Sequence, residues 1–298
     1  MLNSITESLY LVDLEQDLAG FRHFIGSWLY RGDSTTFLVD PGPSHSIDRL
    51  LSVLAEIPVQ SIDYILLTHI HIDHAGGTGK LLEAFPDAHV ICHPKGIPHM
   101  VDPAKLWEGS LKVLGDIARA YGEIASVPAE KISFQEQIDT ADGPIKVIET
   151  PGHAVHHQCF QFGEWLFAGE VAGVRHKTDS LVYARPATPP VFKLEVSLGS
   201  LDKVISLNPA NLCLGHFGFV ESPQTFLLAA RKQLLQWVDT VKEQLDAGSA
   251  DPVADSIAAL KSSDPLISRF KSLEADIRQR EEYFIGNSIK GILQSLRD

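Results

Sequence analysis

Short β-rich runs alternate with helical patterns along the first half of the chain. Runs of β-branched and aromatic residues end at polar residues, Gly or Pro, which is typical of strands, and residues at helical spacing lie between them. We predict strands at 24–30, 35–40 and 62–69 and in AHVICH, with helices around SIDRLLSVLAEI and from Gly76 onward. This alternation indicates layered α/β structure.

The second half repeats the pattern, with strands predicted in IKVIET, HQCFQF, EWLFAGE and NLCLGHFG. Two β-rich halves predict two facing sheets. After Pro223 the pattern changes to long amphipathic helices, QTFLLAARKQLLQWVDTVKEQL and SRFKSLEADIRQREEYFIGNSIKGILQSL, separated by AGSADP. We therefore expect one domain over 1–221 and a helical C-terminal extension over 222–298.

The composition suits a globular protein with a substantial core, since 44% of the 298 residues are hydrophobic. A net charge of −13 argues against a nucleic-acid partner, because phosphate binding depends on clustered Lys and Arg. Cys92, Cys159 and Cys213 lie in strand-like runs without C-x-x-C spacing, so we expect reduced core residues.

The chain shows no sequence sign of a membrane segment. No apolar run approaches the length of about 18 residues that a membrane helix needs, and the N-terminus carries acidic residues where a signal peptide would carry lysines. We expect a cytoplasmic protein with a small-molecule substrate; homodimerisation stays open.

The segment THIHIDHAGG, residues 68–77, brings four metal-ligand side chains together directly after the apolar strand IDYILL. His69 and His71 are two residues apart, so their imidazoles point to the same side of a strand end. We expect the glycines to let the chain turn, so that Asp73 and His74 return to them. Independent placement would give H-x-H-x-D-H in roughly two of a thousand chains of this composition. The motif predicts a site for Zn, Fe or Mn.

Two later histidines also follow predicted strands. His153 lies in the turn TPGH, which can aim one side chain, and His216 follows NLCLG. Either histidine alone would more often be an ordinary residue. Taken together with the motif at residues 68–77, both histidines are candidate metal ligands.

The motifs THIHIDHAGG, TPGH, FAGE and the late GH, each at a strand end, resemble those of the metallo-β-lactamase superfamily, especially its glyoxalase-II-like and lactonase-like hydrolases. The resemblance covers about residues 8–220. It implies an αββα sandwich with metals held in a cleft at one edge of the two sheets. We also expect residues 93–122 to form a helical insertion near that site, since the segment from Pro103 has helical spacing.

The resemblance also implies the ligands of two metals, zinc in the first place, with iron or manganese as alternatives. The first metal would be held by His69, His71 and His153, and the second by Asp73, His74 and His216. The bridging carboxylate would be Glu170, where the family usually has Asp. We expect Glu170 to be a ligand that leaves the second metal more easily lost; the alternative is an ion pair with Arg175 or Arg185.

The implied activity is metal-dependent hydrolysis, in which a metal-bound hydroxide attacks the carbonyl of a thioester, lactone or ester. Asp73 would be the catalytic residue that passes a proton to the leaving group while remaining a ligand. A mononuclear iron dioxygenase of the same superfamily is one alternative. A metal-binding regulatory protein with little catalysis is another.

Other polar residues near the motifs have weaker support. Asp40, in LVDPG, resembles an aspartate beneath the histidine loop, although a turn-capping role is nearly as common, and His157 is expected to support the ligands. His156 is expected to be exposed or structural.

The remaining candidates would contact substrate. His93 and His99 flank a turn beside the expected insertion, and unperturbed loop histidines are the common alternative. Tyr183 and Arg185, in LVYARPATPP, are candidates for recognising a substrate carboxylate or carbonyl, with a surface ion pair as the alternative for Arg185.

Overall fold

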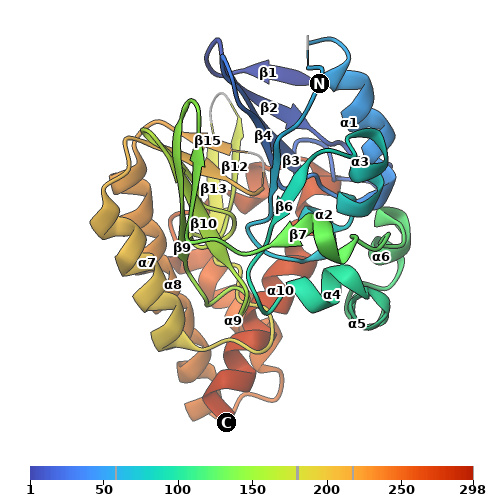
Figure 1. Cartoon of the computed structure of the whole chain (residues 1–298). Helices are drawn as coiled ribbons and strands as arrows, with labels where there is room; N and C mark the ends of the chain where they lie inside the picture. The colour runs from blue at the N-terminus through green and yellow to red at the C-terminus, as the bar shows by residue number, and fades with distance from the viewer. Residues whose placement is uncertain (58, 179–180, 217, 298) are drawn as a thin grey trace.

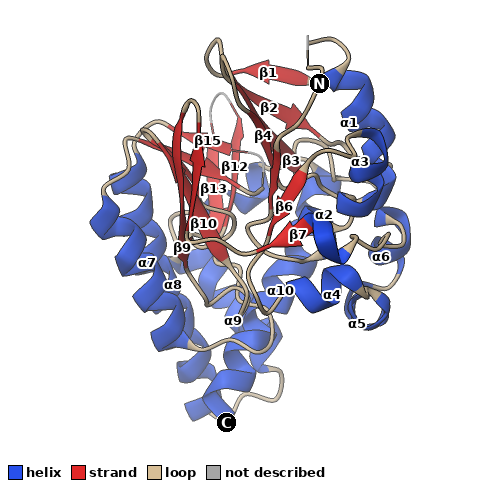
Figure 2. Cartoon of the chain, viewed as in Figure 1, coloured by secondary structure: helices blue, strands red, loops and turns tan. Residues whose placement is uncertain are grey.

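The computed structural model describes residues 1–57, 59–178, 181–216 and 218–297. Two β-sheets face each other, and helices cover their outer faces (Figures 1 and 2). The predicted αββα sandwich with a helical C-terminal region is confirmed. Among the described residues, no helix is long and apolar enough to cross a membrane.

The first sheet has the strand order β1-β2-β3-β4-β5-β6-β7. Strands β1 to β4 pair antiparallel, whereas β4 to β7 pair parallel. The strands are β1 (Leu2–Ser4), β2 (Leu9–Asp13), β3 (Gly26–Arg31), β4 (Thr36–Val39), β5 (Tyr64–Leu66), β6 (His89–Ile91) and β7 (Ile132–Ser133). Helices α1 (Ile47–Leu54), α2 (Ile72–Ala75) and α3 (Thr78–Ala84) connect the parallel strands.

The second sheet has the order β15-β14-β11-β10-β9-β8. Its strands are β8 (Gln137–Thr140), β9 (Gly143–Glu149), β10 (Gln158–Phe162), β11 (Trp165–Phe167), β14 (Asn211–Leu214) and β15 (Gly218–Val220). A separate hairpin, β12 (Val174–Thr178) with β13 (Leu181–Arg185), follows β11. Helix α7 (Leu194–Leu207) then leads back to β14.

Alternation along the strands builds the core between the sheets. Phe160 and Phe162 of β10 point inward, where they join Phe37 and Leu66 of the first sheet, whereas Cys159 points outward to α7 and α8. The described cysteines are all buried and free, as expected.

Several helical stretches differ from the sequence prediction, and α7 was not predicted. The helix expected from Pro103 is divided into α5 (Ala104–Leu114) and α6 (Asp116–Tyr121), because Gly115 adopts a φ of +57°, which ends a helix. With α4 (Ile97–Val101), these helices lie on the same side of the first sheet as α1 and α3, below α3 in the view of Figure 1.

In the C-terminal region, α8 (Pro223–Asp246) is followed by α9 (Pro252–Ser263), which was not predicted, and by α10 (Ala275–Arg297). The segment Ser268–Ser272, expected to open the last helix, is a short 3-10 helix instead. It turns Phe270 into the apolar core that the C-terminal helices share.

Candidate metal centre

The predicted ligands all leave the ends of strands at one edge of the two sheets. His69 follows β5, and α2 carries Asp73 and His74 back toward it; His153, Glu170 and His216 follow β9, β11 and β14 of the second sheet. The sandwich thus places segments far apart in the sequence at one point.

The backbone turn at this motif does not depend on its glycines, which corrects the sequence prediction. The chain turns at His71, which is extended before α2 begins, whereas Gly76 and Gly77 both have negative φ. Gly77 is needed for packing, because a Cβ there would collide with Ile47. Gly169 does need a left-handed conformation, with a φ of +50°, and it sets the direction of the following Glu170.

The first ligand group contains His69, His71, His153 and Glu170, whose candidate atoms all lie within 4.8 Å of one another. Nε2 of His153 lies 2.9 Å from Nδ1 of His71 and 2.9 Å from Oε2 of Glu170. Nε2 of His69 lies 3.4 Å from the same oxygen. Such a set can hold one divalent metal.

The second group contains Asp73, His74 and His216. Oδ2 of Asp73 lies 3.8 Å from Nε2 of His74 and 3.7 Å from Nε2 of His216. Glu170 also reaches this group, with Oε2 3.4 Å from His74 and Oε1 3.2 Å from His216. Its carboxylate therefore lies between the two groups and pairs with neither Arg175 nor Arg185.

The chemistry of these side chains fits a divalent metal. Nε2 of His69 and of His74 are buried and have no hydrogen-bond partner within the described residues. Buried polar atoms are costly unless they are bonded, so a ligand at these nitrogens would remove a penalty. Imidazole nitrogen and carboxylate oxygen are the donors that zinc, iron and manganese take.

The protonation states of the ligands divide into two kinds. Burial and the charges of neighbouring histidines lower the pKa of His69 and His71 well below the usual value, which keeps both in the neutral form that binds metal. Burial alone would lower the pKa of His74 and His153, but the neighbouring carboxylates outweigh it and raise both, so these two imidazoles bind a metal only after they give up a proton. Burial alone would raise the pKa of Glu170, but His153 and His216 outweigh it and hold that pKa well below its usual value. Glu170 is therefore a carboxylate.

Asp40 and Thr68 lie beneath the histidine loop. Oδ1 of Asp40 accepts a hydrogen bond from the Thr68 amide at 2.8 Å, and Oδ2 accepts one from the Thr68 hydroxyl at 2.7 Å. Nδ1 of His74 lies 3.1 Å from Oδ2 of Asp40, so its proton is directed there and Nε2 is left to face the centre. Asp40, His69 and His74 also lie close enough to form a third candidate metal-binding group. The contacts with Thr68 and His74, however, occupy both oxygens of Asp40.

His157 supports Glu170 from behind. Its Nε2 accepts a hydrogen bond from the Glu170 amide at 3.0 Å, and its Nδ1 lies 2.9 Å from the Thr150 hydroxyl. A Cβ on Gly169 would collide with this ring. The imidazole therefore fixes the backbone that aims the carboxylate.

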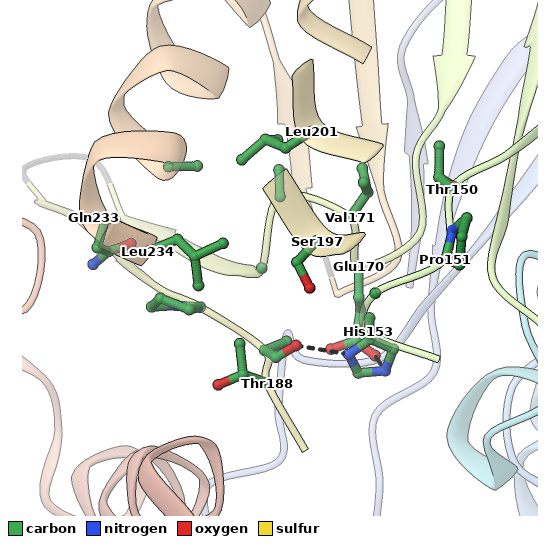
Figure 3. A pocket seen from close by; sticks show the side chains of 16 residues that line it. Thr150, Pro151, His153, Glu170, Val171, Thr188, Ser197, Leu201, Gln233 and Leu234 are labelled. Atoms are coloured by element: carbon green, nitrogen blue, oxygen red, sulfur yellow. Dashed lines mark hydrogen bonds and ion pairs between the residues drawn. The ribbon is translucent and has the colours of Figure 1, made fainter. Parts of the chain in front are cut away.

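A cavity of about 30 Å³ lies behind His153 and Glu170, between them and α7 and α8 (Figure 3). The Ser197 hydroxyl points into it and has no hydrogen-bond partner in the described part of the chain. This space suits one water-sized molecule.

A much larger cavity, of about 830 Å³, opens on the other side of the metal centre. It is lined by the ligands His71, Asp73, His153, Glu170 and His216, by the 95–121 segment and by α10. The segment 93–122 and, of the C-terminal helices, α10 thus both border the site. A cavity of this size takes a ligand of some hundreds of cubic ångströms.

The four candidates for substrate contact separate in the structure. His99 and Arg185 line the large cavity, but Nε of Arg185 donates to Oε2 of Glu281 at 2.6 Å in a buried ion pair, not a surface one. His93 is buried outside the cavity lining, where its Nδ1 accepts from the Lys95 amide. Tyr183 is buried in the core of the C-terminal helices, which corrects its assignment to the substrate.

Sequence reasoning missed His156 and Phe24. His156 lines the large cavity, and its Nδ1 accepts from the Ile70 amide at 3.4 Å. The Phe24 ring stacks on His216 with centroids 4.3 Å apart, and its carbonyl oxygen lies 3.3 Å from Nδ1 of His216. The H-x-x-H-H spacing from His153 was a signal for His156; a lone apolar Phe24 offered none.

We expect the two ligand groups to hold metal with different tenacity. On titration with a chelator, the wild type should lose one metal before another, because Glu170 is one methylene longer than the aspartate usual in the family and would hold the second metal less tightly. Glu170→Ala should retain one metal at most. Metals are counted by mass spectrometry at each chelator concentration. Glu164→Ala, at an exposed position in the preceding turn, serves as the control. Two equally tight metals in the wild type, both kept in Glu170→Ala, would show that Glu170 is no ligand.

Comparisons with known proteins identify the family to which this fold belongs. The family model described as the metallo-beta-lactamase superfamily matches residues 22–216. The metallo-beta-lactamase fold-containing protein ST1585 of Sulfurisphaera tokodaii is 31% identical over 196 residues, which covers 63% of this chain and 71% of that protein. Its crystal structure superposes with a TM-score of 0.73 and 25% identity, over 97% of this chain and 100% of that one.

A hydroxyacylglutathione hydrolase of Prochlorococcus marinus is 31% identical over 133 residues, 45% of this chain, and the match spans only 41% of that enzyme. A metallo-beta-lactamase family protein of Thermus thermophilus shares the fold, with a TM-score of 0.66 and 20% identity over 99% of this chain and 94% of that chain. The match to the family model, over more than half of the chain, means that the chain belongs to the metallo-beta-lactamase superfamily.

Proposed function

We propose that this protein is a metal-dependent hydrolase that cleaves the acyl bond of a thioester, lactone or ester. The observation that carries the proposal is the position of Glu170, whose two oxygens lie among four histidine Nε2 atoms at 2.9 to 3.4 Å. Superfamily membership and the partial similarity to hydroxyacylglutathione hydrolase support it.

His69, His71 and His153 would hold one metal, Asp73, His74 and His216 the other, and Glu170 would contact both. Such metals lower the pKa of water from about 15.7 to near 7 and so supply hydroxide at neutral pH. Hydrolysis then adds the hydroxyl to the acyl carbon, the C–S or C–O bond breaks, and the proton goes to the leaving sulfur or oxygen.

The protein orients its ligands through their other ring nitrogens. Nδ1 of His153 lies 3.0 Å from the Ala187 carbonyl oxygen, and Nδ1 of His216 faces that of Phe24. Each carbonyl can only accept, so each histidine carries its proton on Nδ1 and turns the Nε2 lone pair toward the centre. The site is thus organised before a metal or substrate arrives.

Asp73 is suited to move the proton. Its carboxylate is 17% exposed, against 6% for Glu170, and it lines the large cavity. We expect Asp73→Asn to lower kcat by about 100-fold or more, since general acid–base catalysis contributes about 10² to 10⁴. Metal content is measured in parallel. Full metal content with full turnover in Asp73→Asn would exclude the proton-transfer role.

The function is tested on protein purified without added metal. Metal analysis is followed by a screen of thioesters, lactones and esters, with oxygen consumption recorded alongside. Bound metal with acyl hydrolysis supports the proposal. Iron with oxygen uptake and no hydrolysis would favour the dioxygenase, and bound metal without either activity would favour a regulatory protein.

A further inference from the structure

The walls of the large cavity are apolar well beyond the metal centre. Val113 of α5 and Val155, which follows His153, are 64% and 61% exposed, and both line the cavity with Leu106, Leu114 and Phe284. Helix α5 has no buried residue at all. Large apolar side chains left open around a hollow mark a binding surface for an apolar ligand.

The same cavity carries positive charge that has no partner. Lys95, Lys105 and Lys290 line it from the loop after β6, from α5 and from α10. Their ammonium groups make no hydrogen bond or ion pair with any described residue. Arg185, by contrast, is bound to Glu281.

Negative charge is confined to the metal centre. Among the described lining residues, Asp73 and Glu170 are the only carboxylates, and both lie among histidines. The chain as a whole has a net charge of −13, so a cavity lined by three unpaired lysines differs in sign from the rest of the protein. A cleft lined by one sign of charge concentrates ligands of the opposite sign.

We propose that the ligand of this cavity is an amphipathic anion: an acyl ester or thioester with an elongated apolar part and a carboxylate or phosphate at its far end. The scissile carbonyl would lie at the metal centre, the apolar part along Val113 and Val155, and the anionic group near Lys105 and Lys290. The assignment of this ligand as substrate rests on the proposed function.

Binding is tested first on the full-length, metal-stripped protein, so that no probe can bind a metal. The probes are dansylundecanoic acid and its neutral amide, followed by fluorescence. We expect the acid to bind about tenfold more tightly than the amide, and high salt to weaken only the acid. Equal affinities for acid and amide would overturn the proposal.

Variants separate the lysines from the histidine cluster, which could itself attract an anion. Lys105→Ala and Lys290→Ala should each raise the Kd of the acid about threefold to tenfold, and the double variant should abolish the preference over the amide. Lys232→Ala, an exposed lysine of α8 outside the cavity lining, is the matched control. A preference unchanged in the double variant would overturn the assignment of the charge to these lysines.

Two further experiments test the contribution of the apolar wall and the type of anion that binds. Val113→Asn, at an exposed position, should weaken acid and amide alike; unchanged binding of both would exclude the apolar wall. Competition by dodecanoate, dodecyl phosphate and dodecanol distinguishes carboxylate from phosphate, and equal competition by dodecanol would count against any anion.

Turnover is tested on the metal-loaded enzyme with p-nitrophenyl decanoate and the mono-p-nitrophenyl ester of decanedioic acid. We expect kcat/KM to favour the anionic ester about tenfold, and the lysine double variant to remove that ratio. Charge-selective binding without turnover of any acyl compound would refute the hydrolase and leave the anion site standing. Equal turnover of both esters would refute the anionic substrate and leave the hydrolase standing.

Discussion

Replacing His153 with alanine is expected to strip metal from the first ligand group. Under the proposed function it should also reduce hydrolysis by roughly 1000-fold or more, since a metal held there would supply hydroxide at neutral pH. The Nε2 atom of His153 lies 2.9 Å from both His71 and Glu170, so its removal opens the centre of the group. The sheets should stay intact, because the ligand lies in a turn after β9. Metal content, turnover and far-UV circular dichroism are the measurements.

The matched control is His45→Ala, an exposed histidine outside the ligand groups whose Nδ1 contacts the Ala120 carbonyl. It should keep the metal content and the activity of the wild type. The decisive variant combines His69→Ala, His71→Ala and His153→Ala. Full activity in that metal-free protein would reject the metal-dependent mechanism altogether.

A second large effect is expected on stability at Glu281, which is buried in α10 between Arg185 and Arg280. Glu281→Gln would leave two buried guanidinium groups without a counter-charge. Removing one partner of a buried ion pair costs about 3 to 5 kcal/mol, and we expect a loss of this size in the free energy of unfolding. Urea unfolding at pH 7 measures it.

The neighbouring Glu282 provides the control on the same helix. It pairs with Lys261 at 2.7 Å but is 58% exposed, so Glu282→Gln should cost less than about 1 kcal/mol. Equal effects of the two substitutions would show that the buried pair has no special weight.

The pH dependence follows from the same pair. Burial alone would raise the pKa of Glu281, but Arg185 and Arg280 outweigh it and lower the pKa to about 2 from the usual value of 4.5. The folded state therefore binds this proton less readily than the unfolded state. The stabilisation is fully present above about pH 4.5 and is lost as the pH falls toward 2. The Glu281→Gln variant should lack this part of the acid dependence.

The alternation of strands and helices predicted two facing sheets, and the resemblance of the motifs to the metallo-β-lactamase superfamily implied the αββα sandwich and the full set of ligands. Glu170 was assigned through that resemblance, whereas THIHIDHAGG and the strand-end position of His153 are local signals that a few neighbouring residues carry. Buried strands with clear alternation were recognised for the same reason.

What the sequence could not predict depends on distant partners. Arg185 was a candidate for substrate binding because the segment LVYARPATPP contains no acidic residue that could pair with it. Its partner, Glu281, lies 96 residues later in the sequence. Likewise, the hydrogen bond between Phe24 and His216 joins residues 192 apart. Helices α7 and α9 bury few residues, and their weak amphipathic pattern gave little signal.

The ligands are shared between the two sheets, and this has a thermodynamic consequence. His69, His71, Asp73 and His74 follow β5, whereas His153, Glu170 and His216 follow strands of the other sheet. An ion bound among them would cross-link the two halves, and the unfolded chain does not assemble such a site. Binding that is confined to the folded state adds about 4.1 kcal/mol at a free metal concentration of 1,000 times Kd. The surrounding metal supply would then set how long the folded protein survives, and metal starvation would expose the chain to proteolysis as well as stop its chemistry.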